Sequence, residues 1–179
     1  MAQRFWVGAL MLLALAAGSY GDEKTAGKAS APAPHPGLER MKKLAGTWVA
    51  ADKDGKPTSQ IVSVFKVTSG GSAVQETLFP GSAQEMVSVY TRDGTDLVMT
   101  HYCMLGNQPR MKADPKSPAN QIHFKFAGGT NLNPAKDMHM HEGTITFIDD
   151  DHLETFGVLW DGGKPAKGHE HKMKLIRKK

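Results

Sequence analysis

The stretch LAGTW at residues 44–48 joins a short amphipathic segment to the first strand expected in this chain. Upstream of it, Leu38, Met41 and Leu44 are spaced to face one way on a helical turn. Downstream, segments rich in β-branched and aromatic residues alternate with turn signals about every dozen residues. This pattern predicts one all-β domain over residues 38–179.

The expected strands follow one another as hairpins, without a long crossover between them. Their ranges are 46–51, 60–68, 73–79, 85–92, 96–104, a short strand within 105–111, 121–126, 138–148, 152–160 and 168–177. Pro109 requires an edge or a bulge in the short sixth strand, because proline cannot donate to the ladder. The pattern favours an up-and-down antiparallel β-barrel of about 8 to 10 strands with a short N-terminal helical turn.

Three residues of this pattern resemble a known superfamily. Gly46 and Trp48 form a Gly-x-Trp at the start of the first strand, and Arg177 lies at the end of the last one. The arrangement resembles the calycin barrels, which are the lipocalins, the fatty-acid-binding proteins and the haem-binding nitrobindin-like proteins. The resemblance implies that Trp48 and Arg177 stack to seal one end of the barrel, with a short helix as a plug. It also implies a small, largely apolar ligand inside.

The N-terminal segment has the composition of an export signal. Arg4 precedes the apolar or small residues 5–17, and small residues follow up to Gly21. We therefore expect a signal peptide over residues 1–21, cleaved near Ser19 or Gly21, and a periplasmic or extracellular protein without a transmembrane anchor. Residues 22–37 are rich in Ala, Pro, Gly and Lys and predict a disordered tether.

The charge and the cysteine content of the chain limit the kinds of binding partner and of disulfide that we expect. The net charge is +4, and the basic C-terminal lysines alternate with apolar Met173 and Leu175, which is typical of the solvated face of a strand. We therefore expect no nucleic-acid partner. Cys103 is the only cysteine, so the chain forms no internal disulfide, and its thiol is either buried and inert or available for an intermolecular bridge. A monomer is expected.

Histidine is the most informative residue type, with eight in the chain. Side chains two apart on a strand share a face, so the pairs His139 with His141 and His169 with His171 each present two imidazoles together. Strand alternation places both pairs and His101 on the apolar inner face, although a bulge at Gly143 would turn the first pair outward. Strand direction then gathers all of them at the open mouth.

Two interpretations of these histidines remain open. They predict either a metal site, for zinc or a haem iron, or polar residues at the rim of the barrel that bind water and nearby carboxylates. The first interpretation allows hydrolytic or redox activity. His101 and Cys103 share a face, but the sequence contains no nucleophile elbow, P-loop or dinucleotide fingerprint, and catalysis is not favoured.

The leading functional hypothesis is therefore reversible binding of a small apolar or amphipathic molecule. A barrel of this size can hold one small ligand. The interior side chains expected to contact it are Met99, His101, Phe124, Phe147 and Met173. The alternatives are the metal or haem site and a structural module with a packed interior.

Overall fold

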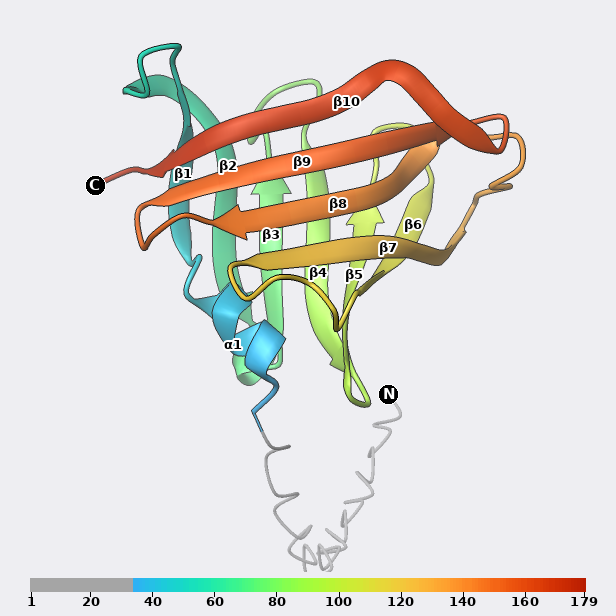
Figure 1. The fold of residues 1–179 in the computed structure, drawn as a ribbon, viewed down its shortest axis with the longest axis horizontal. Helices are drawn as coiled ribbons and strands as arrows, with labels where there is room; N and C mark the ends of the chain where they lie inside the picture. Colours follow the sequence, from blue (N-terminus) through green and yellow to red (C-terminus); the bar gives the residue numbers. More distant parts are fainter. Residues whose placement is uncertain (1–33) are drawn as a thin grey trace, which may run out of the picture. The chain divides into compact units, whose positions relative to one another are not determined.

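The helix α1 (Pro36–Lys42) opens the part of the chain that the computed structural model describes, residues 34–179 (Figure 1). It begins at Pro36 rather than at Leu38, so residues 36–37, predicted to belong to the tether, are helical. Proline suits a first helical position because its φ is already helical, and the ring of His35 accepts a hydrogen bond from the backbone N–H of Leu38. The predicted signal peptide and most of the tether lie outside the described residues.

Ten strands follow α1, as the hairpin pattern predicted. They are β1 (Gly46–Ala51), β2 (Pro57–Thr68), β3 (Ala73–Leu78), β4 (Met86–Asp93), β5 (Asp96–Tyr102), β6 (Gln108–Ala113), β7 (Gln121–Thr130), β8 (His139–Phe147), β9 (His152–Asp161) and β10 (Lys164–Arg177), with a 3-10 turn at Ser69–Gly71. Each strand pairs antiparallel with its neighbours in sequence, and β10 returns to β1. The sheet is therefore a closed up-and-down barrel (Figure 1).

The observed strand boundaries differ from the predicted ones where a turn is shorter than the sequence suggested. Asp161 pairs with Lys164, so Gly162 and Gly163 alone form the β9–β10 turn, and both have positive φ as a type I′ turn requires. The strand β10 thus begins at Lys164 rather than at residue 168. The irregularity expected at Pro109 is present, since the β6–β7 register shifts between Pro109 and Met111.

Trp48 lies at the centre of the sealed end. Its side chain is fully buried, and its indole N–H donates to the carbonyl of Leu44 at 2.8 Å. The apolar residues Leu38, Met41 and Leu44 are buried in the same core, so α1 fills this end of the barrel. The hydrogen bond satisfies the one polar atom of the indole, and burial places the rest of the ring in apolar contact.

Arg177 completes the seal from the last strand. Its guanidinium carbon lies 4.4 Å from the centre of the Trp48 ring, which is the predicted contact. The same guanidinium donates to the carbonyls of Lys43, Ala45 and Asp150, so it also joins the α1–β1 and β8–β9 connections. Gly46 is required beneath it, because a Cβ there would lie 3.1 Å from Nη1 and its φ is +132°.

The buried seal predicts a large effect of Trp48→Ala. Truncating a large aromatic side chain in a core costs about 3 to 5 kcal/mol, and here the cation–π contact is lost as well. Urea unfolding should show this loss, whereas Tyr102→Ala, at a side chain 51% exposed, should cost about 0.5 kcal/mol or less. Equal effects of the two substitutions would show that the seal does not stabilise the barrel.

Candidate functional site

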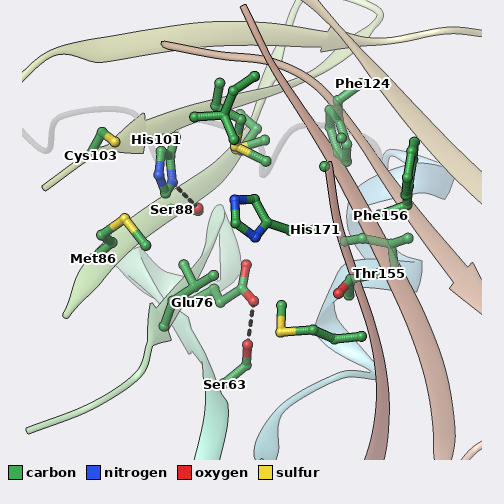
Figure 2. Close-up of a pocket in the computed structure, with 18 of the residues that line it drawn as sticks. Ser63, Glu76, Met86, Ser88, His101, Cys103, Phe124, Thr155, Phe156 and His171 are labelled. Carbon is green, nitrogen blue, oxygen red and sulfur yellow. Dashed lines mark hydrogen bonds between the residues drawn. The ribbon is translucent and has the colours of Figure 1, made fainter. Parts of the chain in front are cut away.

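A cavity of about 350 Å³ lies inside the barrel beyond the sealed end. Most of its wall is apolar and includes Phe79, Phe124 and Phe156 (Figure 2). A further group of its lining side chains are methionines: Met86, Met99, Met104, Met138, Met140 and Met173. Methionine side chains are flexible and polarizable, so this wall can adapt to ligands of different shape.

One side of the cavity is polar. Glu76 on β3 pairs in register with Ser88 on β4, and Ser88 pairs with His101 on β5. Residues paired directly across an antiparallel ladder share a face, and all three line the cavity. They form a polar row across three neighbouring strands.

The opposite wall is hollowed by glycine. Phe124, Gly143, Gly157 and His171 pair in succession across β7, β8, β9 and β10. The two glycines present no side chain to the cavity, and the methyl group of Met140 covers the space, 3.2 Å and 3.6 Å from where their Cβ atoms would lie. The hollow therefore faces the polar row, and the side chain nearest to it is the flexible thioether of Met140.

Glu76 is the buried acid of the polar row, with only 5% of its surface exposed. Its two carboxylate oxygens accept hydrogen bonds from the hydroxyls of Ser63 and Tyr90, each at 2.6 Å. Burial raises the pKa of Glu76, and these two hydrogen bonds partly oppose the change. Among residues 34–179, no lysine or arginine lines the cavity or forms an ion pair with Glu76.

His101 is a neutral base in the same row. Its side chain is 4% exposed, and its Nδ1 lies 2.9 Å from the hydroxyl of Ser88. Burial lowers the pKa of His101 to about 4, so the ring carries no charge at neutral pH. The row therefore holds no positive charge that would balance Glu76.

Two further polar side chains face the cavity from the other side. The hydroxyl of Thr155 is buried and has no hydrogen-bond partner within the described residues. His171 is exposed, and Figure 2 shows its ring pointing into the cavity toward the side of Glu76. These two groups retain hydrogen-bonding capacity that a bound molecule can use.

Four of the five predicted ligand contacts line the cavity: Met99, His101, Phe124 and Met173. Phe147 does not, because it lies at the α1 end, where the guanidinium carbon of Arg40 is 4.2 Å from its ring centre. Alternation predicts the face of a residue but not its depth along the barrel. Cys103 also lines the cavity and is partly exposed rather than buried.

His139 and His141 do not line the cavity. His139 is fully buried, and its Nε2 lies 3.0 Å from Nδ1 of His141. The His141 ring stacks on Trp160, with ring centres 3.7 Å apart, and on its other neighbour Phe126. Burial lowers the pKa of His141, and His139 lowers it further. The pair belongs to a cluster of rings beside the cavity.

The cause is an irregularity in β8. Met140 and Gly143 both line the cavity although they are three positions apart, which regular alternation forbids. The β8–β9 register shifts between Met140 and Glu142, so the residues before the shift change face. This is the effect expected of a bulge at Gly143, and the structure places it between Met140 and Glu142.

The five histidines predicted to share one mouth are therefore distributed over three places. His101 and His171 line the cavity, His139 and His141 lie in the ring cluster, and His169 is exposed where β9–β10 pairing is interrupted. Within residues 34–179, no group of three or more His, Cys, Asp or Glu side chains could hold a metal ion. The described side chains therefore do not provide the three converging protein ligands that a zinc site needs.

Four polar residues that line the cavity were not predicted from the sequence: Glu76, Ser63, Tyr90 and Thr155. A signal for Glu76 was present, since it alternates with Val74 and Leu78 and thus lies on the apolar face of its strand. A charged residue on a core face is uncommon and indicates a function or a buried partner. The hydrogen bonds to Ser63 and Tyr90 join different strands and are visible only in the fold.

Comparison of the chain with protein-family models and with curated proteins found no match. Of the helices within residues 34–179, none is long and apolar enough to cross a membrane.

The low pKa of His101 predicts a pH-dependent loss of stability. In the unfolded chain this histidine takes up a proton near pH 6.5, but in the fold only near pH 4, so stability falls as pH decreases between these values. The shift corresponds to roughly 3 kcal/mol. His101→Asn should remove this component from urea-unfolding curves measured across the pH range.

The matched control is His169→Asn, which changes an exposed ring outside the cavity. It should leave the pH profile of the wild-type chain unchanged. An NMR titration in which the His101 ring gains its proton near pH 6.5 would contradict the assignment.

Proposed function

We propose that this chain is an exported binding protein of calycin type that holds a small, largely apolar molecule inside its barrel. The observation that carries the proposal is the cavity of about 350 Å³, which lies within the size range of small-molecule sites. A barrel whose only role was structural would fill this space with side chains, because protein cores pack densely.

The distribution of polarity in the wall supports an amphipathic ligand. Methionine and phenylalanine side chains cover most of the cavity, whereas Glu76, His101, Thr155 and His171 provide a few polar atoms. Ligand sites combine these two features, since apolar burial provides affinity and a few polar groups fix orientation. We propose binding rather than catalysis as the activity.

Membership of the calycin superfamily is part of the proposal. It is supported by the contact between Trp48 and Arg177, by Gly46 beneath that contact, and by α1 at the same end of the barrel. Export is proposed from the composition of residues 1–21, and a monomer from the closed sheet, which presents no free strand for pairing at the β1–β10 seam.

Retention of a natural ligand gives a direct test. The mature protein, incubated with a total lipid extract, separated from free lipid and examined by native mass spectrometry, should carry one bound small molecule. A protein that repeatedly emerges without any bound molecule would favour the structural alternative.

Filling the glycine hollow should prevent binding. Gly157→Leu adds a branched side chain to the cavity wall, so it should lower affinity for the neutral apolar probe N-phenyl-1-naphthylamine about tenfold or more, measured by fluorescence titration. Val158→Leu adds one methylene group at the next residue, which does not line the cavity, and should bind the probe like wild type. Equal affinities of wild type and both variants would place the probe outside the barrel.

A further inference from the structure

We infer that the ligand is a cationic amphiphile, with a protonated amine beside Glu76 and an apolar body along the methionine and glycine wall. The inference rests on the proposed function, because it assigns the chemical class of the molecule in the same cavity. Two properties of the cavity wall support it: the charges that the wall carries, and the hydrogen-bond donors and acceptors that it leaves available.

The balance of charge favours a cation. Glu76 is buried in the cavity wall, and the part of the chain that the structure describes offers it no lysine or arginine partner. Burying an unpaired carboxylate is costly, which is why burial raises the pKa of Glu76, and a counter-charge would offset that cost and favour the ionised form. His101 is neutral and His171 lies in the exposed part of the wall, so an ammonium group from the ligand would place a charged partner at Glu76.

The direction of the hydrogen bonds favours a donor. The hydroxyls of Ser63 and Tyr90 are already used as donors to Glu76. The acceptors that remain available to a ligand are the other lone pairs of Glu76 and the oxygen of Thr155, whose hydroxyl can also donate. An ammonium group has three donors and no acceptor, so it complements this set.

The geometry of the opposite wall provides room for the apolar body. Gly143 and Gly157 lie side by side on β8 and β9, directly across the cavity from the polar row. The methyl group of Met140 is the side-chain atom nearest to both glycine positions, and this side chain can move at small cost. A hydrocarbon chain can lie in this hollow while its head group remains at Glu76.

The same site disfavours carboxylates. A fatty acid would bring a second carboxylate close to Glu76, and no lysine or arginine lines the cavity within residues 34–179. Like charges at short distance in a region of low dielectric repel strongly. A neutral alcohol of the same length can enter, but it provides one donor instead of three and no charge.

Three ligands of equal chain length test the charge preference on the wild-type protein. Isothermal titration calorimetry at neutral pH should give octylamine about tenfold or more higher affinity than octan-1-ol, with octanoate the weakest. Octanoate or octanol binding as tightly as octylamine would overturn the inference while leaving the binding proposal intact. If none of these ligands and no apolar probe binds, the proposed function itself fails.

Glu76→Gln tests the assignment to this residue. The amide retains the shape of the side chain and one carbonyl acceptor but removes the charge, so affinity for octylamine should fall to within about twofold of that for octanol. Glu170→Gln removes an exposed carboxylate outside the cavity and should keep the wild-type preference. A Glu76→Gln protein that folds and still prefers octylamine tenfold would assign the preference to another group.

Discussion

The stacking of Arg177 on Trp48 is the contact on which the closure of this barrel depends. An antiparallel sheet of ten strands has two edges, and pairing β1 with β10 removes both. The seam is short, running from the pair Trp48 and Arg177 to the pair Ala50 and Leu175. Because so few backbone bonds hold it, the side chain of Arg177 has a large share in joining the ends of the domain. Its bonds to three carbonyl groups anchor α1 and the β8–β9 connection to the same point.

Closure at one end determines where the interior can remain open. The sealed end is filled by α1 and Trp48, with Arg40 over Phe147 at the same end. Beyond it, the wall changes character on both sides, because β3, β4 and β5 contribute a polar row and β8 and β9 contribute adjacent glycines. Neither a polar row nor a pair of adjacent glycines favours a densely packed core, which would use apolar side chains of complementary volume. Departures from good packing are typical of functional sites, where stability is given up for binding.

The charge inside the cavity differs in sign from the charge of the chain. The whole sequence carries a net charge of +4, yet the cavity contains one buried acid, and no lysine or arginine of residues 34–179 lines it. Basic residues of β10 such as Lys172 and Lys174 are exposed and pair with Glu154 on the same sheet. Net charge therefore says little about the interior of the barrel, because solvent screens the surface while the low-dielectric interior preserves the effect of Glu76.

The sequence by itself determined the strand order and the antiparallel barrel, because hydrophobic alternation and turn residues are local properties of the chain. The resemblance carried by Gly46, Trp48 and Arg177 implied the seal. Four of the five side chains that the sequence predicted to contact a ligand line the cavity, namely Met99, His101, Phe124 and Met173. Only the tertiary structure decided how the histidines are distributed, since one register shift in β8 reverses the face of His139 and His141. It also decided that Phe147 belongs to the α1 end, and that Ser63, Glu76 and Tyr90 form one group. Depth along a barrel and contacts between strands depend on register and twist, which alternation within a single strand does not encode.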